Sequence, residues 1–411
     1  MAHPRILAFV LAGGKGERLA PLTNFRSKSS VPFGGRNRIV DFVLSNLVNS
    51  NIYSIYLLVQ YKSQSLIEHV RQNWVLSSMN RDHFVAVVPP QMRMGPEWFQ
   101  GTADAVYQNI NLIQDHNPEL VVIFGSDHIY RMDIRQMIDF HLEKGADVTV
   151  AARPVPLPQA TAFGVIVTDR ERRITAFQEK PEHPAPMPDA SDRAYVSMGN
   201  YIFNRDILIK SLLHAQKRNQ HDFGSHIVPR LVDMGKVYAY DFGTNEIPGR
   251  HSYEEQGYWR DVGTIPAFYQ AHMDMLGDQP VFDLHNKRWP IHPARYKGPA
   301  ANVFNAEIQN SIIADGVIIR KAKIVNSVIR QDVVIENDTV VENSIIMDHT
   351  VIGKRCKLKG IIVDKFNIFP EGLAVSDDVE TDVLNDRLHI YIDPSGIRII
   401  AKPERKIGSE A

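Results

Sequence analysis

The feature that most constrains the fold is a repeat in the last quarter of the chain. Asn310-Ser-Ile-Ile, Asn326-Ser-Val-Ile and Asn343-Ser-Ile-Ile recur, and Lys359-Gly-Ile-Ile is a degenerate fourth copy, at spacings of 16, 17 and 16 residues. Aliphatic residues at about six-residue intervals within such repeats predict the coils of a β-helix, each with three short faces. A string of ordinary β-hairpins is the alternative. Hairpins, however, would not repeat an Asn-Ser-aliphatic pattern at near-constant spacing.

The chain before the repeats alternates short apolar runs with amphipathic stretches. Apolar residues recur at helical spacing in 103–114 and 134–142. Alternating strands and helices predict an α/β fold with a mostly parallel sheet and helices on both faces. The expected buried strands are Ile6–Leu11, Ser54–Val59, Val85–Val88, Leu120–Phe124 and Val148–Ala152.

The pattern of residues 163–276 predicts antiparallel strand pairing and then the end of the first domain. Residues 163–180 alternate around the polar turn 169–172, which is typical of a hairpin. Strands at 195–203 and 236–242 would complete the layer, and Thr264 would cap a closing helix at 264–276. We therefore expect a catalytic domain at 1–277, a Pro-rich linker at 278–300 and a β-helix domain at 301–411.

Composition excludes several classes of protein. The 411 residues are 44% hydrophobic and 23% charged, with a net charge of −1, which is typical of a globular protein and argues against nucleic-acid or membrane partners. No apolar stretch of about 20 residues and no secretory signal is visible. The single cysteine, Cys356, can form no internal disulfide, so we expect a cytoplasmic protein in which this thiol is a small buried hydrophobe.

A glycine loop follows the first strand, in the string Leu11-Ala-Gly-Gly-Lys-Gly-Glu-Arg-Leu-Ala-Pro-Leu-Thr23. Glycines at the carboxyl end of a strand let backbone N–H groups approach a phosphate, and Lys15 and Arg18 add positive charge. The spacing matches neither the dinucleotide-binding fingerprint nor the P-loop. By itself the loop is weak evidence, because it could be a tight strand-to-helix turn.

The longer string through Arg-Leu-x-Pro-Leu-Thr resembles the signature of sugar-nucleotide pyrophosphorylases. Further segments narrow the likeness to the bacterial glucose-1-phosphate adenylyltransferase (ADP-glucose pyrophosphorylase) family. The resemblance implies a Rossmann-like nucleotidyltransferase domain followed by a left-handed parallel β-helix. The segments are 31–42, Gly101-Thr-Ala-Asp-Ala-Val106, Ser126-Asp-His-Ile-Tyr130, Gln178-Glu-Lys-Pro181, Ser197-Met-Gly199, His221-Asp-Phe-Gly224 and Tyr258-Trp-Arg-Asp-Val-Gly-Thr264.

Nucleotidyl transfer to a sugar phosphate needs a divalent cation and positive charge near the leaving pyrophosphate, but no enzyme nucleophile. Asp127 follows the strand 120–124 at its carboxyl end, where open α/β sheets bind ligands, and a carboxylate there suits Mg²⁺. The alternative is that Asp127 caps a following helix. Arg18 suits forked contacts with the β- and γ-phosphates, unless it is a plain surface arginine.

The resemblance implies the remaining roles. Asp127 would be the catalytic, metal-holding aspartate, Asp261 the second metal ligand, and Lys28 a phosphate-contacting lysine. Glucose 1-phosphate would meet Gly164, Glu179, Lys180 and Ser197, although a lysine before proline is more often simply solvated. ATP would meet Leu11, Ala12, Gly13, Gly14, Gln60, Gly101, Thr102 and Asp104, and Thr102 could also cap the helix beginning at Ala103.

The resemblance further implies an allosteric enzyme of glycogen synthesis, a homotetramer with sugar-phosphate or organic-acid effectors. Family members with a fructose 1,6-bisphosphate activator carry a lysine before the position of Arg26, where this chain has Phe25. A phenylalanine cannot pair with a bisphosphate, so we expect fructose 6-phosphate or pyruvate to be the better activator.

Three alternatives to this function stay open. The chemistry could use another nucleotide or sugar, giving a dTDP-, UDP- or GDP-sugar. The chain could be a catalytically silent regulatory subunit, although such a subunit would be expected to lose Arg18, Lys28, Asp127 or Asp261. A β-helix also occurs in acyltransferases, but these usually carry a catalytic histidine on a longer array, and His349 is the only histidine of the short repeat region.

Overall fold

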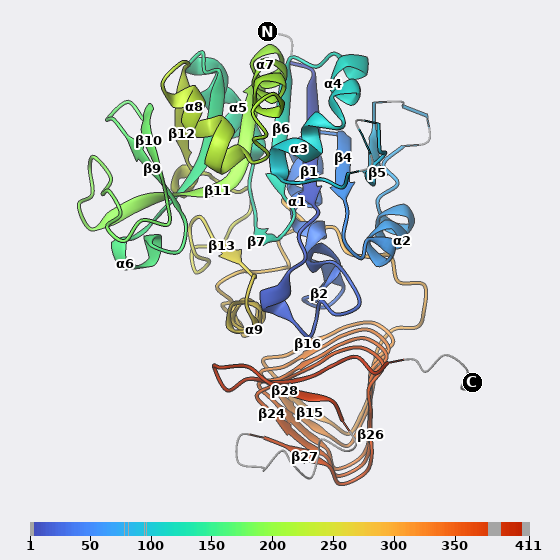
Figure 1. Cartoon of the computed structure of the whole chain (residues 1–411). Helices are drawn as coiled ribbons and strands as arrows, with labels where there is room; N and C mark the ends of the chain where they lie inside the picture. Colours follow the sequence, from blue (N-terminus) through green and yellow to red (C-terminus); the bar gives the residue numbers. More distant parts are fainter. Residues whose placement is uncertain are drawn as a thin grey trace. The chain divides into compact units, whose positions relative to one another are not determined.

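The computed structural model describes residues 4–77, 79–80, 82–93, 95, 97–376 and 388–404. The chain divides into two compact units (Figure 1). Unit 1 comprises Met1–Gly14, Phe42–Ser126 and Tyr130–Arg250, and unit 2 comprises Lys15–Asp41, Asp127–Ile129 and His251–Ala411. The domain limits expected from the sequence stay a prediction.

A nine-stranded mixed sheet forms the centre of unit 1, in the order β10-β9-β11-β6-β1-β4-β5, with β8 paired to β11 and β12 paired to β8. The predicted parallel core is confirmed, because β1 pairs in parallel with β4 and β6, and β4 with β5. The predicted antiparallel excursion is confirmed as the β9–β10 hairpin. The strands are β1 Ile6–Ala12, β4 Ser54–Val59, β5 Phe84–Val88, β6 Leu120–Gly125, β8 Val148–Pro156, β9 Gly164–Thr168, β10 Ile174–Glu179, β11 Arg193–Asn204 and β12 Val237–Asp241.

Helices pack against this sheet around a core that includes Phe9, Val121 and Phe203. The helix expected at 103–114 is in fact two helices, because Asn109 interrupts it. The Asn109 amide donates to the carbonyl of Ala105 at 2.8 Å, a side-chain bond that competes with the regular helical ladder. The helices are α1 Val40–Asn49, α2 Gln64–Asn73, α3 Thr102–Tyr107, α4 Ile110–His116, α5 Ile134–Glu143, α6 Leu157–Ala160, α7 Arg205–Gln216 and α8 Val228–Val232.

Three sheets form the β-helix of unit 2, the orange-to-red coils of Figure 1, and their strands pair in parallel except for β28, which is antiparallel to β29. The inward side chains form one aliphatic core, which includes Ile319, Ile335 and Ile352. The strands of the first sheet are β14 Asn302–Phe304, β17 Ile318–Arg320, β20 Val334–Ile335, β23 Val351–Ile352 and β26 Ile368–Phe369; of the second, β15 Glu307–Gln309, β18 Lys323–Val325, β21 Val340–Glu342, β24 Lys357–Lys359 and β27 Ala374–Val375; of the third, β16 Ile312–Ile313, β19 Val328–Ile329, β22 Ile345–Ile346, β25 Ile361–Val363, β29 Arg398–Ile400 and β28 Ile390–Ile392.

The fourth repeat is displaced by one residue from its expected position. Ile345 pairs with Ile362, so Gly360, and not Lys359, stands where earlier coils have asparagine. Asn310, Asn326 and Asn343 have φ of 45°, 47° and 46°, and Gly360 has 67°. This left-handed corner is the conformation that glycine and asparagine tolerate best, which explains the correction.

The serine of each repeat explains why Asn-Ser recurs. The Ser327 N–H donates to Ser311 Oγ at 3.0 Å, and the Ser344 N–H donates to Ser327 Oγ at 3.1 Å. Each hydroxyl also donates back to its own coil, as Ser327 does to the Val325 carbonyl. The serines therefore satisfy backbone groups at the coil corner that would otherwise lack partners.

Unit 2 also contains short elements from other parts of the chain. These are β2 Pro32–Phe33, β3 Asn37–Arg38, β7 His128–Tyr130, β13 Trp259–Asp261 and α9 Ile265–Met273. Thr264 caps α9 as predicted, accepting the Ala267 N–H. Cys356 is buried in the β-helix core, as expected. Among the described residues, none of the helices combines the length and apolar character needed to cross a membrane.

Candidate active site

Lys28 lies between two carboxylates contributed by distant parts of the chain. Its Nζ is 2.9 Å from Asp127 Oδ2 and 3.0 Å from Asp261 Oδ1. Lys28 opens a short 3₁₀ turn, Lys28–Ser30, and is only 7% exposed. Asp127 precedes β7, and Asp261 ends β13, which pairs with β7. Strand pairing therefore holds the two carboxylates beside the lysine.

The charges in this cluster stabilise one another. Burial alone would lower the pKa of Lys28, but Asp127 and Asp261 more than offset it and raise the pKa. Burial alone would raise the pKa of Asp127, but His128 and Lys28 hold it well below its usual range. The cluster therefore pairs a lysinium with the ionised Asp127 at neutral pH, and Asp261 contacts the same ammonium.

The same cluster has the composition of a divalent-cation site. Ligand atoms of Asp127, His128 and Asp261 all lie within 4.8 Å of one another, and each residue is partly exposed. Carboxylate oxygens are the ligands that Mg²⁺ prefers, so the two aspartates fit this ion. The alternative that Asp127 caps a helix is wrong, because the strand β7 follows it.

Sequence reasoning did not identify His128. Its Nε2 is 3.5 Å from Asp127 Oδ1, and its ring centroid is 4.6 Å from that of Trp259. The adjacency of His128 to Asp127 was the only signal available, because the contact with Trp259 depends on the pairing of β7 with β13.

Arg18 lies beside the same cluster. A Cβ added at Gly263 would be 3.0 Å from Asp261 Oδ1 and 3.1 Å from Arg18 Nη2. Gly263 therefore leaves the space in which this guanidinium and carboxylate approach each other. Arg18, Lys28, Asp127 and Asp261, four residues predicted to act together, meet within unit 2.

The predicted phosphate loop begins at the carboxyl edge of the sheet in unit 1. Leu11 and Ala12 end β1, and Gly13 and Gly14 follow with partly exposed backbone. The Leu11 carbonyl accepts bonds from the Ser126 N–H at 3.2 Å and the Ser126 hydroxyl at 2.7 Å, which ties β1 to the end of β6. A Cβ at Gly14 would have no atom within 4 Å. Glycine there is not required by the packing of the free protein.

Gln60 follows β4 at the same edge and holds the loop that precedes Gly101. Its Oε1 accepts the Phe99 N–H at 2.7 Å, and its Nε2 donates to the Phe99 carbonyl at 3.2 Å. This amide therefore pairs with a backbone peptide in the way that an adjacent strand would.

Gly101, Thr102 and Asp104 meet a turn at 221–223. A Cβ at Gly101 would lie 2.3 Å from the His221 carbonyl oxygen, so only glycine fits there. Thr102 does not cap the helix, which has Gly101 at its N-cap; its hydroxyl donates to Asp222 Oδ2 at 2.8 Å instead. Asp104 Oδ2 accepts the Gln100 N–H at 2.9 Å.

The predicted sugar-phosphate residues gather at one end of β10-β9-β11. Glu179 pairs with Gly164, and Val196, the neighbour of Ser197, pairs with Val165. A Cβ at Gly164 would be 2.8 Å from the Phe177 ring. Lys180 has φ of 44°, and its Nζ lies 3.6 Å from Glu179. Both of these charged side chains are exposed.

Comparisons with known proteins match both the α/β part of the chain and the repeat region. A nucleotidyl transferase family model matches residues 7–277, and a GlmU-like C-terminal hexapeptide model matches residues 293–400. A glucose-1-phosphate adenylyltransferase of Thermodesulfovibrio yellowstonii is 65% identical over 403 residues, which are 98% of this chain and 97% of that protein. A protein of the same name from Anaeromyxobacter sp. is 44% identical over 98% of this chain and 99% of its own length. One from Thermus thermophilus is 47% identical over 80% of this chain and 82% of its own length. The chain therefore belongs to the glucose-1-phosphate adenylyltransferase family.

Proposed function

We propose that this protein transfers the adenylyl group of ATP to glucose 1-phosphate, giving ADP-glucose and pyrophosphate, and so supplies glucosyl units for glycogen. The observation that carries the proposal is the Lys28–Asp127–Asp261 cluster, in which one cation and two carboxylates meet within 3.0 Å. The full-length similarity to named adenylyltransferases supports the choice of substrates.

The reaction needs positioning and charge, not an enzyme nucleophile. A phosphate oxygen of glucose 1-phosphate attacks the α-phosphorus of ATP, and the bond from that phosphorus to the bridging oxygen of pyrophosphate breaks. Lys28 would neutralise charge on the phosphates in this step, and Arg18 would hold the β- and γ-phosphates. Backbone N–H groups of Gly13 and Gly14 would contact phosphate oxygens of the nucleotide.

Asp127 and Asp261 would hold Mg²⁺, which supplies positive charge to the triphosphate when it is bound. Their oxygens lie close enough to share one ion, and both side chains are partly exposed to solvent. Because Lys28 now contacts both oxygens, it would turn toward the phosphates when the ion binds.

The remaining predicted residues would recognise the two substrates. Gly164, Glu179, Lys180 and Ser197 lie together at one strand end, which supports a common role toward glucose 1-phosphate. Leu11, Ala12, Gln60, Gly101, Thr102 and Asp104 would shape the nucleotide site. In this proposal, residues at the exposed ends of strands contact the sugar and the nucleotide. The buried hydrogen bonds of these residues hold the loops in place.

Pyrophosphate release by the purified protein tests the proposal. Glucose 1-phosphate and Mg²⁺ are supplied with ATP, dTTP, UTP or GTP in turn, with and without fructose 6-phosphate, fructose 1,6-bisphosphate and pyruvate. We expect release with ATP and loss of release in Asp127→Asn. Release with another nucleotide alone would overturn the substrate, and no release under any condition would favour a regulatory subunit.

We also propose that the protein self-associates, as a homotetramer, through its β-helix. An outward column of aliphatic residues runs along one sheet, with Ile318, Val334, Val351 and Ile368 in direct register. Ile368 is 72% exposed and Val351 is 36% exposed. The second sheet carries Lys323 and Lys357 in comparable outward positions. A contiguous apolar column on one face supports association there.

We propose that sugar phosphates or organic acids regulate this protein and that fructose 1,6-bisphosphate is a poor activator. We also propose that the protein resides in the cytoplasm. Phe25 is 45% exposed, and Lys402 Nζ lies 5.6 Å from its ring centroid. The adjacent Arg26 is already paired with Asp364, at 2.6 Å and 2.7 Å from the two carboxylate oxygens. The Arg26–Asp364 pair reduces the positive charge free to bind a bisphosphate, and the Phe25 side chain supplies none. Activation by low-micromolar fructose 1,6-bisphosphate would contradict this proposal.

A further inference from the structure

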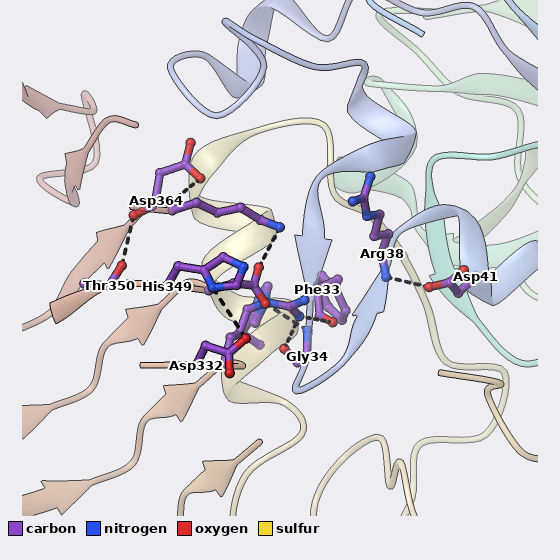
Figure 2. A network of polar contacts seen from close by, with 12 residues as sticks. Phe33, Gly34, Arg38, Asp41, Asp332, His349, Thr350 and Asp364 are labelled. Carbon is purple, nitrogen blue, oxygen red and sulfur yellow. Dashed lines mark hydrogen bonds and ion pairs between the residues drawn. The ribbon is translucent and has the colours of Figure 1, made fainter. Parts of the chain in front are cut away.

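A buried arginine of the β-helix donates two hydrogen bonds to a turn of the N-terminal segment that contains Lys28. Arg330 follows β19, and its side chain is only 3% exposed. Its Nη1 donates to the carbonyl of Phe33 at 2.8 Å and to that of Gly34 at 2.5 Å. Figure 2 shows this network, with Phe33 and Gly34 at the tip of their hairpin facing the coils of the β-helix.

The Phe33–Gly34 turn is connected to Lys28 by a short, fully buried stretch. Lys28–Ser30 form a 3₁₀ turn, Pro32 and Phe33 form β2, and β2 pairs with β3. The Ile39 N–H donates to the Val31 carbonyl, which closes this stretch on itself. With so little freedom in between, a displacement of the Phe33–Gly34 turn moves Lys28 as well.

A second contact joins the same turn to the helix that follows Asp261. The Gly34 N–H donates to His272 Nε2 of α9 at 3.2 Å, and His272 Nδ1 donates to the Phe268 carbonyl at 2.9 Å. Burial lowers the pKa of His272 to about 3, so the ring is neutral and Nε2 can accept this bond. The turn is therefore fixed to the Asp261 side through α9 and to the β-helix through Arg330.

Arg330 is itself held by buried charges of the β-helix coils. Its Nε is 3.2 Å from Asp348 Oδ1, and Lys365 Nζ is 2.7 Å from Asp348 Oδ2. Burial alone would raise the pKa of Asp348, but Arg330 and Lys365 hold it well below its usual range. The carboxylate thus stays ionised at neutral pH and orients the guanidinium toward the two carbonyls.

We propose that Arg330 is a positioning residue for nucleotidyl transfer. By fixing the Phe33–Gly34 turn, it keeps the Lys28 ammonium at the place where it neutralises the reacting phosphates. The inference rests on the proposed function, and it makes a β-helix side chain part of the support of the active site. Neither of the carbonyls that Arg330 binds belongs to a residue with a predicted role.

The test compares Arg330→Met with Arg330→Lys in the full-length protein. Methionine keeps most of the volume but donates no hydrogen bond, whereas lysine can still donate to one carbonyl. We expect Arg330→Met to lower kcat about tenfold or more with less than a threefold change in either KM, and Arg330→Lys to recover at least a third of the wild-type kcat. A merely structural contact would give no such split between kcat and KM.

A matched control separates positioning from loss of stability. Ile335→Ala removes a buried aliphatic side chain of the β-helix core, on a different sheet from the strand that precedes Arg330. We expect Ile335→Ala to lower Tm and leave kcat near wild type. Equal loss of kcat in Ile335→Ala and Arg330→Met, or wild-type kcat in Arg330→Met, would overturn the inference.

Binding of Mn²⁺, followed by electron paramagnetic resonance without substrates, gives a readout besides activity. A looser Lys28 competes less well for the carboxylates, so we expect Arg330→Met to bind Mn²⁺ at least twofold more tightly than the wild type. Unchanged binding would contradict the link to Lys28. If Arg330→Met does not fold, Asp348→Asn, which leaves the guanidinium in place, should show the same changes in smaller degree. An inactive wild-type protein would instead refute the proposed function.

Discussion

Lys28 sits where the divalent ion is expected, so its removal should tighten metal binding while it abolishes activity. Its Nζ is 2.9 Å and 3.0 Å from the Asp127 and Asp261 oxygens, whereas Mg²⁺ would need to stand about 2.1 Å from each. The ammonium must therefore leave before the ion can enter. Without nucleotide phosphates to receive it, this departure costs free energy that opposes metal binding.

The cost follows from the exposure of the two pairs. The side chain of Lys28 is 8% exposed, but those of Asp127 and Asp261 are 39% and 28% exposed, so solvent screens both interactions. Partly exposed ion pairs of this kind stabilise the protein by about 0.5–1 kcal/mol each, which is the upper part of the range for exposed pairs. Breaking two pairs costs about 1–2 kcal/mol, which corresponds to about a five- to thirtyfold change in metal affinity.

Titration of Mn²⁺ into nucleotide-free protein measures this difference, with free ion followed by electron paramagnetic resonance. We expect Lys28→Gln to lower the Kd for Mn²⁺ by about five- to thirtyfold and to reduce turnover below detection. Lys28→Arg, which retains the charge, should keep a Kd near that of the wild type. Asp261→Asn removes a ligand and should weaken binding. A Kd for Lys28→Gln equal to or above the wild-type value would refute the reasoning.

Three further predictions concern single positions. Gly14→Ala should leave Tm unchanged, because nothing lies within 4 Å of the added Cβ, but should reduce kcat/KM for ATP about tenfold or more, about 1.4 kcal/mol, by keeping phosphate from the backbone. Gly101→Ala should lower stability to urea by about 1–3 kcal/mol, because its Cβ would displace the His221 carbonyl that accepts the first N–H groups of α3. The pKa of Asp348 is lower in the folded protein than in the unfolded chain, so its carboxylate stabilises the fold above the unfolded pKa of about 4, and this stabilisation is lost as the pH falls below about 4. Asp348→Asn should therefore flatten the fall of Tm below about pH 4. An unaltered pH profile of Tm would contradict this.

Local sequence patterns predicted the elements that depend on local physics. Four of the five strands expected to be buried occur within one or two residues of their expected limits, and the fifth, β8, is longer. β5 is only partly buried. Repeat spacing predicted the β-helix but placed the fourth copy one residue early, because the run Ile361-Ile-Val363 offers an aliphatic pair in either register. The left-handed corner at Gly360 decides the register, and that requirement belongs to the backbone of the stacked coil.

The candidate site was predicted residue by residue only through resemblance to a family. Asp127 could be argued from its place after a strand and Arg18 from its place beside the glycine loop, whereas nothing local in the sequence marks Asp261 or Lys28. Their meeting depends on the pairing of β7 with β13 and on the turn that holds Lys28, both of which are long-range contacts. For the same reason, the sequence marks His128 only by its place next to Asp127, and it does not mark Arg330.

The division of the chain gives these contacts a functional meaning. Residues 15–41 and 127–129 lie in the first third of the sequence, yet they belong to the same compact unit as the β-helix. The predicted phosphate-binding and metal-binding side chains Arg18, Lys28, Asp127 and Asp261 are therefore built on the unit that contains Arg330. Any event that shifts the β-helix coils, such as self-association or effector binding, would reach Lys28 through packed side chains and two hydrogen bonds at Phe33 and Gly34. If Arg330→Met abolishes the response to an effector together with kcat, this path carries the regulation; if the response survives at a lower kcat, the effector acts by another path.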